Sequence, residues 1–150
     1  MGRTHTKLDY HVVFSTKSRV LWISEAIECR VWEYLGGIAK RYGMHPYRIG
    51  GVEDHVHLAL GIPPTLAVSR ALQLLKGGSS RWIGESFPKL REFAWQDGYG
   101  AFTVSKSILP SVENYILQQR QHHQKQTFQD EFRELLTKHG IAYVDQYLWG

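Results

Sequence analysis

The sequence predicts an α+β protein in which helices cover an antiparallel four-stranded sheet and further helices follow. Short runs of β-branched and aromatic residues alternate with longer stretches whose apolar residues recur every three or four positions. The predicted order is strand, helix, strand, strand, helix, strand, and then C-terminal helices. The chain has 150 residues, 43% apolar and 21% charged, which is typical of a globular domain. It contains no internal repeat or linker-like segment, so we expect residues 1–150 to form a single domain.

The first half of the chain begins with a predicted strand over residues 8–15, which are rich in β-branched and aromatic side chains. A helix follows, with Ser24 as its expected N-cap and apolar residues at helical spacing as far as Arg41. Residues 44–51 and 55–61 are then predicted to be two strands joined by a short connection, as in a β-hairpin.

The second half begins with two prolines, which end the third strand and precede a long predicted helix. A short β-rich run and two more helices follow, and the last helix starts with T-F-Q-D, which approximates a capping box. The predicted bounds are 65–87 for the first of these helices, 101–105 for the strand, 107 or 109 to 124 for the next helix and 127–140 for the last. This order matches the ferredoxin-like split βαβ plan, with an antiparallel sheet, helices mainly on one face and C-terminal helices added.

The formal net charge is +4 and the sequence pI is about 9.2. This mildly basic balance permits contact with a phosphate backbone and argues against a strongly cationic substrate. No apolar run approaches the roughly 18–20 residues of a membrane span, and the N-terminus lacks the apolar core of a signal peptide. We therefore expect a cytoplasmic protein, and we expect its sole cysteine, Cys29, to be a small core residue.

Two histidines, His55 and His57, lie two residues apart in the third predicted strand. Because alternate side chains of a strand share a face, both imidazoles point the same way and form half of a metal site. In an isolated His-x-His pattern, the histidines are more often simply hydrogen-bonded. A histidine-triad hydrolase would have a third histidine where Ala59 stands, and a structural zinc site would need cysteines. The metal-site interpretation therefore requires ligands from elsewhere in the chain.

Tyr115 and Gln119 are the candidates to complete this site, because residues four apart on a helix share one face. A tyrosine phenol can act as a nucleophile, and a glutamine offers an amide oxygen as a hard, neutral ligand. Two imidazoles with one amide oxygen suit Mg²⁺ or Mn²⁺. The alternative is that Tyr115 belongs to the core, since this spacing is common by chance.

Three segments, taken together, resemble one family. EDHVHL at residues 53–58 resembles the His-hydrophobic-His motif of the HUH superfamily of single-strand DNA endonucleases. WQDGYGAFTVS at residues 95–105 is similar to the segment before the catalytic helix in the single-tyrosine branch, and YILQQ at residues 115–119 resembles that helix. Over residues 8–148 the chain is similar to the small insertion-sequence transposases that use one tyrosine, and to their relatives associated with repetitive extragenic palindromes.

The resemblance implies a transposase that cleaves single-stranded DNA at the ends of a mobile element, often beside a DNA hairpin. Tyr115 would be the nucleophile, leaving a 5′-phosphotyrosine link and a free 3′-hydroxyl for strand transfer. His55, His57 and Gln119 would hold a divalent ion, Mg²⁺ or Mn²⁺. The resemblance also implies a homodimer in which subunits can share active sites, acting on DNA in a bacterial or archaeal cytoplasm.

Other polar residues are candidates for supporting roles. Those for DNA contact follow the first strand or lie on the second long helix: Lys17, Arg19, Lys76 and Arg81. The alternative is that these side chains are simply solvated. Asp54 is a candidate acceptor that orients an imidazole of the metal site. We expect His122 and His123 to be exposed near a helix C-terminus, and His11 to be a hydrogen-bonded core histidine.

Two other functions remain open at this point. A non-catalytic, domesticated relative would bind single-stranded nucleic acid without any chemistry, although it would not need the histidines, the tyrosine and the glutamine together. A metal-dependent nuclease would activate water at the metal and leave Tyr115 as a bystander. A covalent protein–DNA product would distinguish the transposase from both.

Overall fold

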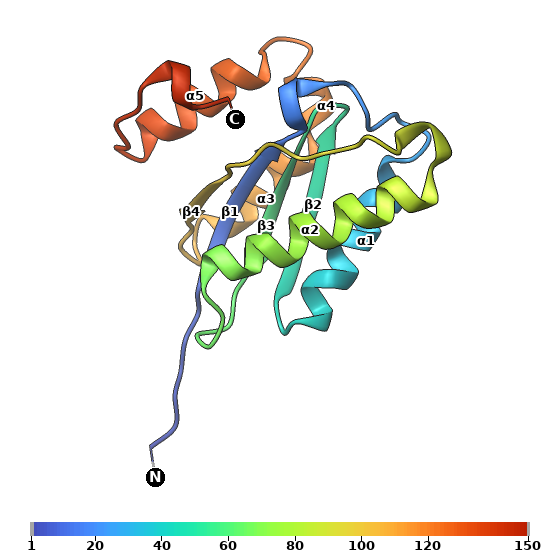
Figure 1. Cartoon of the computed structure of the whole chain (residues 1–150). Helices are drawn as coiled ribbons and strands as arrows, with labels where there is room; N and C mark the ends of the chain where they lie inside the picture. The colour runs from blue at the N-terminus through green and yellow to red at the C-terminus, as the bar shows by residue number, and fades with distance from the viewer. Residues whose placement is uncertain (1, 150) are drawn as a thin grey trace.

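The computed structural model describes residues 2–149, whose strands form a four-stranded sheet (Figure 1). The strands are β1 (Asp9–Ser15), β2 (His45–Val52), β3 (His55–Gly61) and β4 (Gly100–Thr103). Their order across the sheet is β2-β3-β1-β4, and each neighbouring pair is antiparallel. The chain order and the antiparallel pairing are those of a ferredoxin-like split βαβ fold, so the predicted fold class is confirmed.

Two helices cover one face of the sheet: α1 (Glu28–Arg41) and α2 (Val68–Ser86). Alternate residues of the central strands, among them Val12, Phe14 and Leu58, point to this face and are fully buried against the helices. Burial of each such side chain stabilises the fold by about 1.5–3 kcal/mol. The two helices approach closely at Gly78, where an added Cβ would lie 2.9 Å from Cδ1 of Ile38. An alanine at this position would require the end of the Ile38 side chain to shift.

Three further helices lie on the opposite face: α3 (Leu109–Leu117), α4 (Gln119–His122) and α5 (Phe128–Lys138). Figure 1 shows α2 in front of the sheet and α3 behind it. On this second face, Ala59 of β3 packs against Ile116 of α3, and Val13 of β1 packs in a separate cluster with Phe132 of α5. The polar side chains of the central strands lie between these two small apolar clusters.

The start of α1 differs from the prediction. The helix begins at Glu28 because Ser24 opens a turn instead: its carbonyl oxygen accepts bonds from the N–H groups of Ile27 and Glu28, at 3.1 and 3.0 Å. Cys29 lies in the first turn of α1 and is exposed, so the expectation of a core cysteine was wrong.

Single 3₁₀ turns occur at Lys17–Arg19, Pro88–Leu90 and Asp145–Tyr147. Among residues 2–149, no helix combines the length and apolar character that a membrane span needs.

The helix predicted to run to residue 124 is interrupted at Gln118, whose φ of −98° and ψ of 17° lie outside the helical range. Gln119 therefore begins a separate short helix, α4. A turn then leads into α5, where the Thr127 side chain accepts a bond from the N–H of Asp130 at 3.2 Å, as the capping pattern predicted. These two changes of direction bring α5 back over the sheet face that carries the histidines.

Candidate active site

The side chains of His55 and His57 are fully buried on the face of β3 that lies under α3 and α5. Nδ1 of His55 lies 2.8 Å from Oδ1 of Asp54, so the contact expected for Asp54 is present. Nδ1 of His57 lies 2.7 Å from Nε2 of His11. With Nδ1 engaged in both rings, the two Nε2 atoms face the space between the sheet and the helices. Proteins commonly orient metal-binding imidazoles in this way.

The tyrosine-bearing segment packs directly on its own sheet. At Gly50 in β2, an added Cβ would lie 2.9 Å from the backbone oxygen of Ile116, so the glycine lets α3 approach this closely. Arg120 in α4 forms ion pairs with three carboxylates near α1 and the β2–β3 turn: Glu28 at 2.8 Å, Glu53 at 2.8 Å and Glu25 at 3.1 Å. The neighbouring Gln119 is buried, and its Oε1 lies 3.0 Å from Nε2 of His55.

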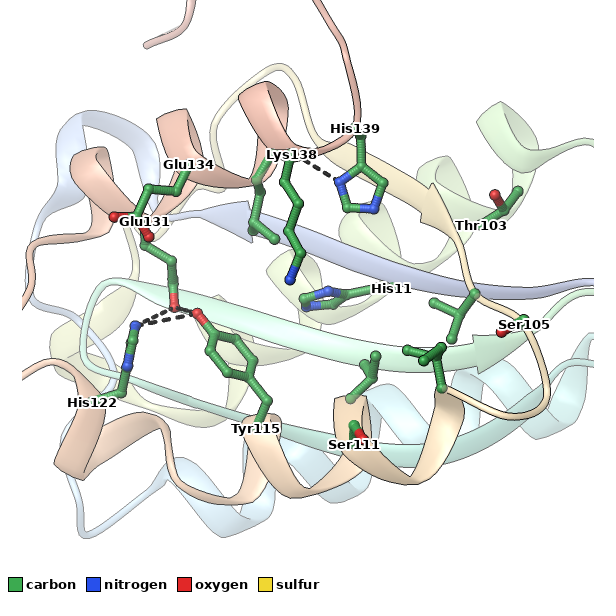
Figure 2. Close-up of a pocket in the computed structure, with 14 residues that line it drawn as sticks. His11, Thr103, Ser105, Ser111, Tyr115, His122, Glu131, Glu134, Lys138 and His139 are labelled. Atoms are coloured by element: carbon green, nitrogen blue, oxygen red, sulfur yellow. Dashed lines mark hydrogen bonds and ion pairs between the residues drawn. The ribbon is translucent and has the colours of Figure 1, made fainter.

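Glu131, on α5, lies at the centre of the site and was missed by the sequence analysis. The residue is only 1% exposed. Its Oε1 lies 2.9 Å from Nε2 of His57 and 3.1 Å from Nε2 of His123. Its Oε2 accepts bonds from the Tyr115 hydroxyl and, at 3.2 Å, from Nε2 of Gln119. Figure 2 shows the Tyr115 hydroxyl pointing at this carboxylate, which connects a motif histidine to the predicted nucleophile.

The sequence does contain a signal that Glu131 is buried. Phe128, Phe132 and Leu136 recur every four residues and form the buried face of α5. Glu131 belongs to that face, since it lies three residues after Phe128, and residues three apart on a helix are neighbours. An acidic residue on a buried helix face needs buried polar partners, and such a pattern predicts a polar site beneath the helix.

His123 also lies in the site, so the expectation that it is an exposed histidine was wrong. Its side chain is 10% exposed, and Nε2 lies 3.1 Å from Oε1 of Glu131. The interruption at Gln118 and the turn into α5 carry it inward. His122 stays at the rim, with a side chain 33% exposed and Nε2 at 3.3 Å from the Tyr115 hydroxyl.

Four side chains are arranged so that they could hold a metal ion: His55, His57, His123 and Glu131. One potential ligand atom from each lies within 4.8 Å of all the others. Gln119 adds an amide oxygen beside His55. Imidazole nitrogens combined with carboxylate and amide oxygens form a mixed donor set that fits a divalent cation, and the cation would offset the buried charge of Glu131.

Burial controls the protonation states of the site. It lowers the pKa of His57 to about 4, and together with the neighbouring His57 it lowers the pKa of His11 to about 3. Both rings are therefore neutral at pH 7, which leaves nitrogen lone pairs available for a metal. Burial raises the pKa of Tyr115, and the charge of Glu131 raises it further. Burial alone would raise the pKa of Glu131 as well, but the imidazoles around its carboxylate hold that pKa below its ordinary value.

A cavity of about 550 Å³ opens beside Tyr115, between α3, α5 and the end of β4 (Figure 2). This volume is within the range of ligand-binding sites. Tyr115 and Glu131 lie at one end, and the ammonium group of Lys138 reaches toward His11 from α5. The remaining wall mixes hydroxyl and apolar side chains, among them Thr103, Ser105, Ser111, Ile108, Val112 and Leu135. The tyrosine can therefore be approached from the cavity, while the motif histidines behind it are buried.

The basic residues predicted to contact DNA do not form one group. Lys17 and Arg19 follow the end of β1, whose last residue pairs with His55 of β3. Lys76 and Arg81 lie on α2, which covers the opposite face of the sheet. Lys76 donates to two backbone carbonyls of the loop before β4, at 2.8 and 3.1 Å, whereas the Arg81 side chain is 81% exposed.

An antiparallel sheet with two buried histidines, packed against the helices α3 and α4 that carry Tyr115 and Gln119, is the arrangement expected of the single-tyrosine transposases that the sequence resembles. Comparison with known proteins gives the family: residues 4–119 match the family described as "Transposase IS200 like", and the chain belongs to this family of DNA-cleaving transposases. The matched segment includes His57 and Tyr115 and ends at Gln119, before His123 and Glu131.

Individual relatives agree with this assignment. The chain is 28% identical over 115 residues to the ISDra2 transposase TnpA of Deinococcus radiodurans. This alignment covers 73% of this chain and 82% of that protein. It is 30% identical over 125 residues to the transposase for insertion sequence element IS200 of Salmonella typhimurium, covering 79% of this chain and 81% of that protein.

Solved structures also resemble the fold. A crystal structure from Deinococcus radiodurans R1, described as a transposase, matches with a TM-score of 0.65 and 29% identity, over 79% of this chain and 96% of that one. A REP-associated tyrosine transposase bound to a REP hairpin matches with a TM-score of 0.59, over 82% of this chain and 73% of that one. Its identity of 12% shows the likeness of fold alone.

Proposed function

We propose that this chain cleaves single-stranded DNA at the ends of a mobile element and rejoins it through a covalent 5′-phosphotyrosine at Tyr115. The position of the Tyr115 hydroxyl carries the proposal. It bonds to Glu131, whose other carboxylate oxygen lies 2.9 Å from Nε2 of His57, and it borders an open cavity. A nucleophile and the histidines of a metal site are thus within reach of one phosphate group.

We assign His55, His57 and Gln119 as ligands of a divalent ion, Mg²⁺ or Mn²⁺, and Asp54 as the residue that orients His55. When bound, the ion would supply positive charge that stabilises the phosphate in the transition state. The neutral state of His57 at pH 7 supports this assignment, since a metal ligand must offer a free lone pair.

In the proposed reaction, the O–H bond of Tyr115 breaks and its oxygen forms a bond to phosphorus, while the bond from phosphorus to the 3′-oxygen of the preceding nucleotide breaks. The proton of Tyr115 passes to solvent water by way of Glu131, which accepts the bond from the Tyr115 hydroxyl. The departing 3′-oxygen takes up one proton from water and becomes a free hydroxyl, so the step consumes no net proton. Because the covalent link retains the energy of the phosphodiester, a second 3′-hydroxyl can displace Tyr115 and rejoin the strand without ATP. The raised pKa of Tyr115 means that the phenol is still protonated before the attack.

The DNA strand is proposed to enter through the cavity, where Lys138 is the cation on the wall. Lys17 and Arg19 are proposed phosphate contacts near the histidines, and Lys76 and Arg81 are proposed contacts for a more distant part of the DNA. A hairpin is a suitable candidate for that part, because one structural neighbour is bound to a REP hairpin.

We also propose a homodimer that acts on cellular DNA in the cytoplasm. Within a single chain, Gln119 already lies beside His55, and Tyr115 already bonds to Glu131.

The proposal is tested with a denaturing gel of the purified protein and labelled single-stranded DNA from the flanks of its own gene, with and without Mn²⁺. Tyr115→Phe is the matched variant, because it removes only the hydroxyl. We expect a metal-dependent covalent protein–DNA band with the wild type and none with the variant, whose DNA affinity should stay within about twofold.

The other outcomes identify the alternatives. Binding without a covalent band, on DNA that contains the element's ends, would indicate a non-catalytic nucleic-acid-binding protein. Cleavage without the band would indicate a nuclease that uses water. Cleavage by Tyr115→Phe at the wild-type rate would show that another group is the nucleophile.

A further inference from the structure

We propose that Glu131 is a ligand of the divalent ion through one carboxylate oxygen and holds the Tyr115 hydroxyl at that ion through the other. This inference deepens the proposed function and rests on it for the role of Tyr115. Glu131 lies outside the segment that matches the family, which ends at Gln119.

The first step of the argument is the charge of the buried carboxylate. Glu131 is 1% exposed, and a buried carboxylate is ordinarily paired with a cation. Within residues 2–149, the ion-pair partners of Glu131 are histidines, and none is a lysine or an arginine. A divalent ion among those imidazoles would place positive charge directly beside this carboxylate.

The second step is the convergence of ligand atoms. Oε1 of Glu131 lies 2.9, 3.1 and 3.5 Å from the Nε2 atoms of His57, His123 and His55. Three imidazole nitrogens around one carboxylate oxygen form the inner wall of a cation site, with the fourth donor contributed by α5. The carboxylate also bonds to Nε2 of Gln119, which leaves the amide oxygen of Gln119 directed at His55. Glu131 thereby sets the orientation in which Gln119 can be a ligand.

The third step is the contact with the nucleophile. Oε2 of Glu131 accepts the hydroxyl of Tyr115, so one side chain connects the nucleophile to the group of metal-ligating atoms (Figure 2). Phe128 and Phe132 flank Glu131 and are buried under the C-terminal segment, where their rings contact Trp149. This packing fixes α5, and with it the carboxylate, over the sheet.

The test is Mn²⁺ titration by calorimetry, without DNA, of the wild type, Glu131→Gln and Glu134→Gln. Glu134 is the matched control, because it lies one turn further along α5 on the wall of the same cavity but is exposed. We expect Glu131→Gln to lower the Mn²⁺ affinity by about tenfold or more, and Glu134→Gln to leave it unchanged. Equal affinities for all three proteins would overturn the assignment of Glu131 as a ligand.

Circular dichroism during thermal unfolding shows whether Glu131→Gln is folded. If Glu131→Gln does not fold, a measurement on the wild type alone tests the inference. Anomalous diffraction from crystals grown with Mn²⁺ should place the ion in direct contact with Oε1 of Glu131. An ion bound elsewhere in the cluster, without contact to Glu131, would contradict the inference.

The contact with Tyr115 has its own measurement, the rate of covalent product formation at saturating Mn²⁺ and saturating DNA. Glu131→Gln should lower this rate while the DNA affinity stays near that of the wild type, and Glu131→Asp should recover part of the Mn²⁺ affinity. An unchanged rate would exclude the positioning role. If the wild type bound Mn²⁺ through Glu131 but formed no covalent product, the proposed function would fail and the metal assignment would stand.

Discussion

Nε2 of His11 lies 2.7 Å from Nδ1 of His57, and the two residues come from the adjacent strands β1 and β3. The bond fixes the ring of His57 through Nδ1, so that Nε2 of His57 faces Glu131. The sequence predicted only that His11 is a hydrogen-bonded core histidine, and the structure identifies its partner. Because a metal-binding imidazole depends on the partner of its second nitrogen, His11 should affect metal binding without touching the metal.

His11→Phe is therefore expected to lower the Mn²⁺ affinity by about 10- to 100-fold. The aromatic ring preserves the edge contacts of His11 with Phe102 and Tyr115, but it leaves Nδ1 of His57 without a partner. Calorimetric titration with Mn²⁺ in the absence of DNA measures the effect directly.

Two further variants make this result interpretable. His11→Gln places an amide near the position of Nε2 and should recover much of the affinity. His5→Ala, in the exposed N-terminal segment, should have no effect. Wild-type affinity in His11→Phe would mean that the orientation of His57 does not depend on this bond.

Gly50→Ala should destabilise the protein and displace the tyrosine helix. The added Cβ would lie 2.9 Å from the backbone oxygen of Ile116, and α3 can only relieve this contact by moving away from β2. We expect a loss of about 1–3 kcal/mol in the free energy of unfolding, as for other overpacked sites. Urea denaturation followed by circular dichroism measures it.

Gly37→Ala is the control for this prediction. Gly37 lies inside α1, and an added Cβ there would meet nothing within 4 Å. Because alanine is the better helix former, the change should stabilise the protein by roughly 0.5–1 kcal/mol. Equal effects of the two substitutions would show that the contact between Gly50 and α3 is not tight in solution.

Much of the fold could be predicted from the sequence because local rules determine it. The alternation of β-rich and helical patterns gave the strands and helices in the right order, and the capping residue Thr127 marked the start of α5 correctly. The start of α1 was wrong because the carbonyl group of Ser24, rather than its side chain, closes the turn before the helix. A sequence pattern identifies a residue that can cap a helix, but not the competing turn that its backbone can form.

Strand alternation predicted that His55 and His57 share a face, and helical spacing predicted that Tyr115 and Gln119 do. The structure brings all four together, while their chemical roles stay predictions. Glu131 could not be placed in the same way. Its apolar neighbours indicate burial, but its position depends on the interruption at Gln118 and on the turn into α5, and local periodicity does not specify where a helix returns.

Arg120→Met is expected to affect cleavage more than stability. Arg120 pairs with three carboxylates, but its side chain is 36% exposed, so the loss of unfolding free energy should be no more than about 1 kcal/mol. The adjacent Gln119 loses the anchor that holds α4 on the sheet, so the rate of covalent product formation should fall by about tenfold or more. Single-turnover kinetics with labelled single-stranded DNA measures this rate.

Arg133→Met is the matched control, since Arg133 is similarly exposed and pairs with Asp130 and Asp145 on the outer side of α5. It should cost a similar amount of stability and leave the cleavage rate unchanged. A comparable loss of cleavage in both variants would attribute the effect to general loosening of the fold instead of to the anchoring of Gln119.

Lys138→Ala should weaken the binding of single-stranded DNA and reduce its dependence on salt. The ammonium group of Lys138 lies on the wall of the cavity beside Tyr115, where the proposed DNA strand carries its phosphates. Losing one phosphate contact should lower the slope of log affinity against log salt by about 0.7, as expected for single strands. Fluorescence anisotropy with metal-free protein at several salt concentrations measures the slope.

Lys89, in the turn after α2, is exposed outside this cavity, and Lys89→Ala should keep the wild-type slope. If both variants kept it, the strand would have to reach Tyr115 by a path that avoids Lys138.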